Sequence, residues 1–452
     1  MTGRLTLEEL ERLAASGRID TVICGAPDMQ GRLMGKRFTA RHFLDAAHEE
    51  THSCNYLLAT DMEMHTVPGY AATSWAAGYG DYIQKPDLST LRIAGWTESS
   101  ALVIADLLDH HGDPVPHAPR NMLKRQIDRL AALGYGTAAA TELEFFLFKE
   151  SFEDLAARKW REPTPISPYN EDYHIFQTAK EEGVIRPLRN GLMASGVHVE
   201  NTKGEAEAGQ HEINIRYADA LGAADTHMIV KEATKEVAWA HGHAATFMAK
   251  YDHAAAGSSS HVHMSLTAKD GPPFHDPSAP HGMSALMRQF LGGQVAHAAE
   301  AAFFLAPFVN SYKRFCVGMF APTKIVWSRD NRTAGFRVVG EGTKGVRVEC
   351  RIGGADLNPY LAIAGLLACG IAGIEGKMDP GEEFRGDAYF GDVPSIPPTL
   401  REATAKLEGS AMLRAAMGDA VIDHYVRCAR WEQEDFDAKV TDYERVRGFE
   451  RA

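Results

Sequence analysis

The chain has 452 residues, which is long enough for two or three domains with a buried core. It carries 60 Asp and Glu residues against 47 Lys and Arg residues, and the resulting formal charge of −13 disfavours nucleic acid as a partner because a phosphate backbone would be repelled. The six cysteines form no C-x-x-C pair, and no window reaches about 18 consecutive apolar residues. We therefore expect a cytoplasmic protein with no disulfide framework and no membrane partner.

The N-terminal quarter of the sequence predicts a helix followed by short strands. Residues 1–18 have the pattern of an amphipathic helix, and residues 19–40 have the pattern of strand, turn and strand with glycines at the corners. Residues 110–120 are rich in Pro, Gly and His and predict a boundary between a domain of residues 1–110 and a larger domain of residues 111–452.

The larger part begins with a predicted helix from about Arg120 to Leu133 and ends in about sixty charged, helical residues. Between them strands and helices are mixed without a regular βαβ alternation. This order predicts the α+β class, with a small β-rich N-terminal part and a larger catalytic part.

Four segments of the larger part alternate polar and apolar side chains with the period of a strand. Each has Glu, His or Arg on one face and apolar residues on the other; they are 141–148 (TELEFFLF), 211–217 (HEINIRY), 261–266 (HVHMSL) and 346–352 (VRVECRI). Alternation of this kind predicts an antiparallel sheet with one face packed on a core. The polar face could simply meet solvent, as many half-buried strands do.

A metal site is the other explanation of these polar faces. Glutamates two residues apart on one strand repel each other unless a cation lies between them. The candidate ligands are five carboxylates and one imidazole: Glu142, Glu144, Glu205, Glu212, Glu349 and His261. Oxygen-rich ligands suit Mg²⁺ or Mn²⁺, whereas zinc prefers Cys and His, so the pattern favours a two-metal site that handles phosphate.

Arginines are concentrated between residues 314 and 351, although the chain as a whole is acidic. They are Arg314, Arg329, Arg332, Arg337, Arg347 and Arg351. Guanidinium groups bind carboxylate and phosphoryl oxygens in pairs of hydrogen bonds and stabilise the charge that develops in phosphoryl transfer. Arg329 taken alone is better explained by a surface ion pair. The chain has no G-x-x-x-x-G-K-[ST] loop, so metal ions and arginines would have to bind the phosphates.

Taken together, these motifs resemble the glutamine synthetase family and follow that family's order over nearly the whole chain. They are PDLSTLR (86–92), ELEFFLF (142–148), EAEAGQHEI (205–213), GSSSHVHMSL (257–266), NSYKRFCVGMFAP (310–322), DNRTAGFR (330–337) and VRVECRIGGADLNPYL (346–361). The resemblance implies a small β-grasp-like N-terminal domain and a catalytic domain with a curved antiparallel sheet flanked by helices.

The resemblance also implies a role for each site residue. Glu144, Glu205 and Glu212 match ligands of the metal beside glutamate, and Glu142, His261 and Glu349 match ligands of the metal nearer ATP. Nucleotide- or phosphate-binding positions are matched by Tyr217, His263, Ser265, Arg337, Lys344 and Arg347. Gly257, Arg314 and Arg351 match residues that hold glutamate, and Arg332 matches the one that stabilises the transferred phosphoryl group.

The family's reaction has two steps. The γ-carboxylate of glutamate attacks the γ-phosphate of ATP, and an amine then displaces phosphate from γ-glutamyl phosphate. Membership would imply two to three Mg²⁺ or Mn²⁺ ions at each site, with ATP as co-substrate. It would also imply a dodecamer of two stacked hexameric rings, in which the N-terminal domain of one subunit completes its neighbour's site.

The chain departs from glutamine synthetases proper at three places. Phe320 stands where the family has a flap glutamate that binds and deprotonates ammonium. Residues 58–70 replace an aspartate-glycine-serine-serine stretch, and we expect Asp61 or Glu63 there to take over as the acid that binds the amine. Ala256 stands where an asparagine commonly contacts glutamate.

Phe320 points to an amine larger than ammonia, as in the γ-glutamylpolyamine synthetase branch and its relatives that act on ethanolamine, alkylamines or arylamines. Phe320 and Trp327 could form an apolar wall of the amine pocket, and each methylene buried there contributes about 0.8 kcal/mol. The alternatives are a true glutamine synthetase, a non-catalytic sensor of glutamate, glutamine or ATP, and a purely structural ring protein. The sequence does not identify the amine.

Overall fold

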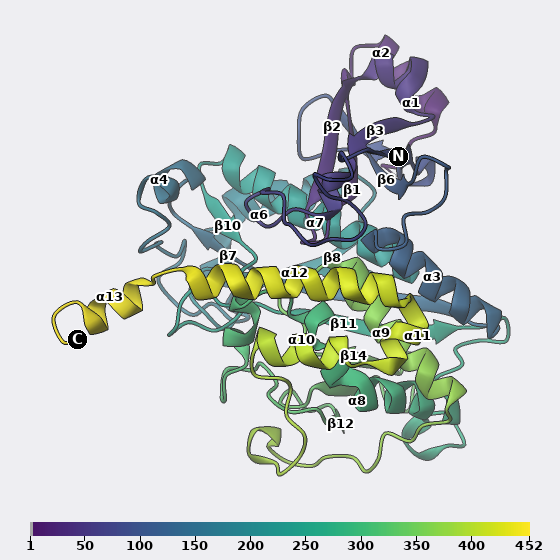
Figure 1. Ribbon diagram of the computed structural model, residues 1–452, viewed down its shortest axis with the longest axis vertical. Coiled ribbons are helices and arrows are strands. Elements are labelled where there is room, and N and C mark those ends of the chain that lie inside the picture. Colours follow the sequence, from purple (N-terminus) through teal and green to yellow (C-terminus); the bar gives the residue numbers. More distant parts are fainter. Residues whose placement is uncertain (1–2) are drawn as a thin grey trace.

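The structure, a computed structural model, describes residues 3–452 and shows two β-sheets with helices packed around the larger one (Figure 1). The N-terminal sheet stands at the top of Figure 1, and α12 crosses the front of the body below it. The helices are α1 (Leu7–Ala15), α2 (Ala40–His42), α3 (Pro119–Ala132), α4 (Phe152–Ala157), α5 (Ile175–Ala179), α6 (Glu182–Ala194), α7 (Ala220–Ala240), α8 (Ala285–Leu305), α9 (Pro359–Glu375), α10 (Leu400–Glu408), α11 (Ala411–Met417), α12 (Asp419–Ala438) and α13 (Asp442–Gly448).

The first sheet has six strands in the order β2-β1-β6-β4-β3, with β5 also paired to β6. Only β1 and β6 run parallel to each other among these pairs. The strands are β1 (Thr21–Pro27), β2 (Leu33–Thr39), β3 (Thr51–Cys54), β4 (Asp81–Pro86), β5 (Arg92–Ile93) and β6 (Ser100–Leu108). Helix α1 begins at a capping box in which Thr6 and Glu9 exchange hydrogen bonds. The domain boundary near residue 110 stays a prediction.

The second sheet has eight strands in the order β12-β13-β14-β11-β7-β9-β8, with β10 also paired to β7. They are β7 (Gly136–Phe148), β8 (Val199–Gly204), β9 (Gln210–Ile215), β10 (Ala244–Thr246), β11 (Ser260–Thr267), β12 (Trp327–Arg329), β13 (Phe336–Val339) and β14 (Arg347–Cys350). The four predicted polar-faced strands are β7, β9, β11 and β14, and they are neighbours paired antiparallel, which confirms the predicted sheet.

Apolar side chains of these strands pack on helices and thereby fix which face of the sheet is polar. Leu143, Phe145 and Ile213 join a buried cluster with α6 and α7, while Val262 and Val348 join the main core with α8 and α9. A fully buried side chain of this size contributes about 1.5–3 kcal/mol. Because successive residues of a strand point to opposite faces, this packing directs the intervening Glu, His and Arg side chains to the other face.

A buried arginine joins the first sheet to the helices of the larger part. Arg120 of α3 donates to Asp87 (2.7 Å), Asp106 (2.6 Å) and Asp225 (2.9 Å), and Tyr360 of α9 donates to Asp225 (2.6 Å). Removing one partner of such a buried cluster costs about 3–5 kcal/mol because the remaining charges stay uncompensated. The cluster therefore holds the PDLSTLR segment against α7 and α9.

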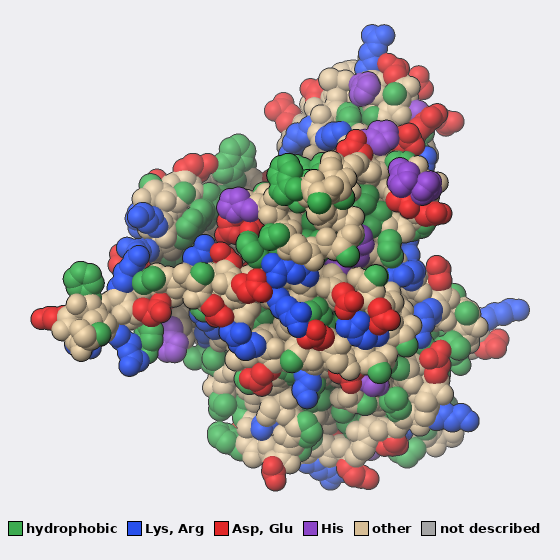
Figure 2. Space-filling view, viewed as in Figure 1, with side chains coloured by type: hydrophobic (Ala, Val, Ile, Leu, Met, Phe, Trp, Pro, Cys, Tyr) green, Lys and Arg blue, Asp and Glu red, His purple; other side chains and the backbone are tan. Residues whose placement is uncertain are grey.

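The outer surface carries charges of both signs. On the face crossed by α12, Lys and Arg side chains are interspersed with Asp and Glu side chains (Figure 2). Among the described residues, no helix combines the length and the apolar character needed to cross a membrane.

Two buried histidines in contact, His117 before α3 and His424 on α12, predict a loss of stability in acid. The rings of His117 and His424 lie 4.1 Å apart, and burial lowers the pKa of His117 to about 4 and that of His424 well below its usual value. Unfolded histidine takes up a proton near pH 6.5, so the stability held by the neutral rings is lost as pH falls from about 6.5 to about 4. The loss is roughly 1.4 kcal/mol per pH unit for each proton.

We expect the apparent melting temperature to be lower at pH 5 than at pH 7, and His424→Asn to reduce this difference. His111→Gln, at an exposed histidine, serves as the control and should leave the difference unchanged. An equal pH difference in wild type and His424→Asn, measured by thermal unfolding, would contradict the assignment.

Candidate active site

Three glutamates converge at the centre of the polar face. Glu144 of β7 lies directly opposite Glu212 of β9, and Glu205 follows the end of β8. Each offers a carboxylate oxygen within 4.8 Å of the others. Glu144 and Glu212 are only 7% and 6% exposed, so little water screens their mutual repulsion.

The raised pKa values of these carboxyls show that it is electrostatically unfavourable to bury several carboxylates side by side. Burial and then the charge of Glu205 raise the pKa of Glu144 to about 7, although the N–H (2.6 Å) and hydroxyl (2.5 Å) of Ser259 donate to it. Burial and then Glu144 raise the pKa of Glu212 to about 8. A divalent cation among the three oxygen donors would remove this repulsion, so the residues fit the predicted magnesium or manganese ion.

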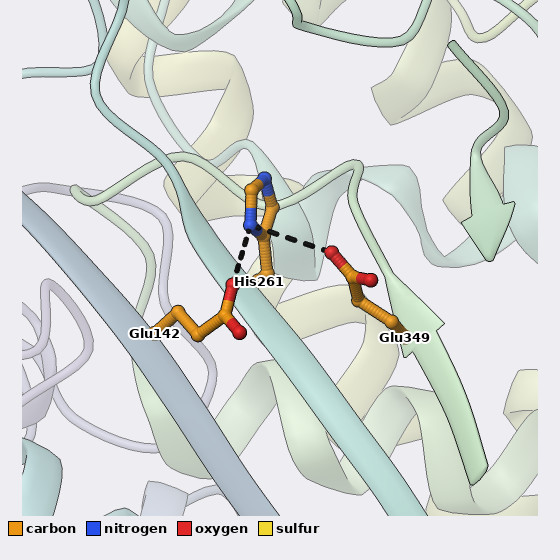
Figure 3. A group of neighbouring side chains, drawn as sticks. All are labelled: Glu142, His261 and Glu349. Carbon is orange, nitrogen blue, oxygen red and sulfur yellow. Dashed lines mark hydrogen bonds and ion pairs between the residues drawn. The ribbon is translucent and has the colours of Figure 1, made fainter. Parts of the chain in front are cut away.

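A second group lies beside the first on the same face. His261 of β11 places Nδ1 3.0 Å from Glu142 of β7 and 3.5 Å from Glu349 of β14 (Figure 3). Burial, followed by the charge of Arg351, lowers the pKa of His261 to about 4, so the ring is neutral and can serve as a metal ligand. Burial opposes ionisation of Glu142, but hydrogen bonds from His261 and His263 outweigh it and hold its pKa well below the usual range. The six candidate ligands thus form two adjacent groups of three.

Arginines line the other side of these groups. Arg351 contacts Glu349 and donates to the carbonyl of Arg332 (3.2 Å), while Arg337 donates to Glu349 (2.9 Å). Arg314 is buried and donates to the carbonyls of Ile352 (3.0 Å) and Arg351 (3.1 Å). Within residues 3–452, the buried Nε–H groups of Arg314 and Arg337 have no hydrogen-bond partner, so both can still bind an anion.

A cavity of about 410 Å³ lies between the carboxylates and the arginines. Its wall includes the first group of glutamates, the four predicted residues Gly257, Arg314, Arg332 and Arg351, and Phe320. A Cβ at Gly257 would lie 2.7 Å from both the Ala249 carbonyl oxygen and Arg314 Cγ, so a side chain there would displace the arginine. The glycine therefore keeps the backbone open toward the cavity.

A second cavity, of about 380 Å³, shares Glu142 with the first. Five of the six residues predicted to bind ATP or its phosphates line it: Tyr217, His263, Ser265, Lys344 and Arg347. The sixth, Arg337, lines the first cavity instead, because β13 directs it onto Glu349. The wall of the second cavity is more apolar than that of the first and includes Ala138–Ala140 and Met264. An apolar wall of this kind suits the flat ring of a nucleotide base.

Three residues predicted for the amine site lie outside both cavities. Trp327 is 4% exposed and donates through its indole N–H to the Gly381 carbonyl (3.1 Å), so it belongs to the core and not to the wall around Phe320. Asp61 accepts from Trp431 (3.2 Å) and from the N–H of His65 (2.8 Å), which closes its own turn. Glu63 lines a separate cavity beside Lys439. The predicted surface ion pairs of Arg329 are present, with Glu383 and Glu341 both 2.9 Å away.

Several residues of the first cavity are not among those predicted from the sequence. Lys203 of β8 lies opposite Glu212, and Gln210 stands two residues before Glu212 on the same strand face. The strand period would have found both. Asp172 and Tyr173 come from an irregular segment before α5, and no pattern in the sequence placed them there. Ser259, the donor to Glu144, stands within the GSSSHVHMSL motif.

Comparisons with known proteins agree with this geometry. The family model for the glutamine synthetase catalytic domain matches residues 116–447. The gamma-glutamylethanolamide synthetase GlnA4 of Streptomyces coelicolor is 47% identical over 100% of this chain and 97% of its own. The glutamate–isopropylamine ligase of a Pseudomonas species is 38% identical over 95% of both chains. A solved complex of GmaS with ADP superposes with a TM-score of 0.85 at 28% identity, covering 97% of this chain and 99% of that one.

The clustered carboxylates predict that divalent cations stabilise the protein. A ligand that binds only the folded state raises the melting temperature in proportion to the logarithm of its concentration. We expect Mg²⁺ or Mn²⁺ to raise the apparent melting temperature, and Glu212→Gln to require at least about 10-fold more metal for the same rise.

The control for this measurement is Glu11→Gln, at an exposed glutamate of α1. A metal response equal in Glu212→Gln and wild type would show that the ions bind elsewhere.

Proposed function

This chain belongs to the glutamine synthetase family, and we propose that it is an ATP-dependent ligase that joins the γ-carboxylate of glutamate to a small organic amine. Relatives that match over nearly the whole chain are named as a gamma-glutamylethanolamide synthetase and a glutamate–isopropylamine ligase, which supports an amine over ammonium. In this proposal the two groups of ligands hold two to three Mg²⁺ or Mn²⁺ ions.

The two cavities divide the reaction between them. In this proposal ATP binds in the second cavity against Tyr217 and Ser265, and its phosphates extend to Glu142, which lines both cavities. The side chains of Lys344, Arg347 and Arg337 would neutralise the negative charge of these phosphates. Glutamate lies in the first cavity, with its carboxylates on Arg314 and Arg351 and its amino end at the backbone of Gly257. Bound cations would neutralise the phosphate and carboxylate oxygens and so let these anions approach.

The chain's own groups then support two steps. The γ-carboxylate attacks the γ-phosphate, which forms γ-glutamyl phosphate and releases ADP, and Arg332 stabilises the phosphoryl oxygens. The neutral amine attacks the γ-carbonyl carbon, the C–O bond to phosphate breaks, and the amide forms as hydrogen phosphate leaves with the proton that the nitrogen loses.

Phe320 is the observation that favours an organic amine. Its side chain is 60% exposed and borders the first cavity between Met319 and Ala321. Its backbone is left-handed (φ 56°), which is uncommon for a bulky residue and holds the ring at the rim. An aromatic ring cannot accept a proton from ammonium as a carboxylate would, but it can cover the methylenes of an amine at about 0.8 kcal/mol each.

The amine's acid or base would come from a second subunit. Asp61 and Glu63 lie away from this protomer's cavities, so in our proposal the N-terminal domain of a neighbour brings them to the site in a dodecamer of two stacked hexameric rings. Glu63 is the more available of the two, because Asp61 is engaged by Trp431 and by its own turn. In this assembly the amine site is complete only when neighbouring subunits are joined in the ring.

Release of ADP with glutamate and a panel of amines tests the proposed function. We expect ADP release with ethanolamine and isopropylamine to exceed that with ammonium, putrescine or aniline at equal concentrations of the neutral amine. Release with ammonium alone would indicate a glutamine synthetase, and no release with any amine would indicate a sensor.

Phe320→Glu tests the reason for this preference. A carboxylate at the rim binds ammonium and accepts its proton, and it removes apolar surface from the amine. We expect kcat/KM for isopropylamine to fall by at least about 4-fold, the value of one buried methylene, while kcat/KM for ammonium rises. Phe320→Leu keeps an apolar side chain and should retain the wild-type order of amines, and the same order in Phe320→Glu would contradict the assignment.

A further inference from the structure

Lys203 places an alkylammonium group inside the first cavity. Its Nζ lies 3.1 Å from a carboxylate oxygen of Asp172 and 4.2 Å from the centre of the Tyr173 ring, and it contacts Glu205. The side chain is only 17% exposed. Two carboxylates and an aromatic face are the groups that bind an organic ammonium ion.

The position of this lysine follows from the sheet. Lys203 pairs with Glu212 across β8 and β9, and Glu212 pairs with Glu144 across β9 and β7, so the three side chains share the polar face. The Nζ contacts Glu205 and lies 3.1 Å from a carboxylate oxygen of Asp172, so the ammonium group is held beside the first group of glutamates.

Asp172 and Tyr173 reach the cavity from outside the sheet. They belong to the segment before α5, and the carboxylate of Asp172 is partly exposed at 38%. Without Lys203, this carboxylate and ring would form an open binding site for a second positive charge at the mouth of the cavity. With Lys203 present, that site is filled by the chain itself.

We propose that Lys203 determines the amine specificity, because its ammonium group occupies the place where the distal ammonium of a diamine would bind and thereby restricts the enzyme to monoamines. The inference rests on the proposed function and names its substrate class. Two like charges about 4 Å apart repel each other strongly in a partly buried site. A neutral hydroxyl or methyl group at the far end of the amine meets no such repulsion.

Putrescine and pentylamine form a matched pair for the test, since they differ in a terminal ammonium against a methyl group. We expect the ratio of kcat/KM for putrescine to that for pentylamine to be well below one in the wild type. Lys203→Met should raise this ratio by at least about 10-fold, since the variant opens the site on Asp172 and Tyr173. The ratio is taken within one protein, so a general loss of activity or metal affinity cancels.

Three further variants sharpen the result. Lys203→Arg keeps the charge and should keep the low ratio, while Lys203→Met combined with Asp172→Asn should lose most of the gain. Lys180→Met is the control, because Lys180 lies 4.9 Å from the Phe176 ring in the same region but lines neither cavity. If Lys203→Met is too unstable to assay, Lys203→Gln provides the same comparison.

A ratio in Lys203→Met within about 2-fold of the wild-type value would overturn the inference while leaving the proposed function intact. A wild-type preference for putrescine over pentylamine would also overturn it. Wild-type protein that releases no ADP with any amine would instead reject the proposed function, and the inference with it.

Discussion

Negative charge gathered on one face of the larger sheet is the constraint on which the rest of the site depends. Antiparallel pairing sets Glu144 opposite Glu212 and His261 opposite Glu142, and burial denies Glu144, Glu212 and His261 the screening of water. Such a face is unfavourable by itself, as the raised pKa values of Glu144 and Glu212 show. Bound cations remove this repulsion, so the arrangement of strands that makes the face acidic also makes it a site for cations.

The chain supplies part of that positive charge itself. Arg337 and Arg351 bind Glu349, and Lys203 contacts Glu205, while Ser259 adds neutral hydrogen-bond donors to Glu144. Each cation approaches from a different element, so together they enclose the cavity without filling it. The same arrangement leaves donors free for anionic substrates, because Arg314 and Arg337 each keep an Nε–H directed at no partner within residues 3–452.

Substrate selectivity and catalytic machinery come from different kinds of structure. The candidate metal ligands and the arginines lie mostly on strands whose apolar faces pack on α6 to α9, which makes them rigid. Phe320, Asp172 and Tyr173, which surround the proposed amine, lie on irregular segments at the rim. Loops of this kind can change without cost to the core, so a family with one reaction can accept different amines.

Periodicity in the sequence was enough to predict the sheet and to bring Glu142, Glu144, Glu212, His261 and Glu349 to one face. It would also have placed Lys203, which stands two residues before Glu205, had the pattern been followed into the preceding strand. Trp327 was expected to form an apolar wall of the amine pocket with Phe320, but its side chain packs in the core. The resemblance implied a nucleotide- or phosphate-side role for Arg337, which lines the first cavity and donates to Glu349 there.

The sequence by itself determined which side chains share a face, because a strand alternates with a period of two and this period can be read without coordinates. It determined the acyl and phosphoryl chemistry as well, through the order of the motifs. Only the tertiary structure decided which strands are neighbours, where Asp172 and Tyr173 reach the cavity, and that Asp61 lies away from it. These facts depend on chain segments far apart in sequence, and no local pattern encodes the distance between them.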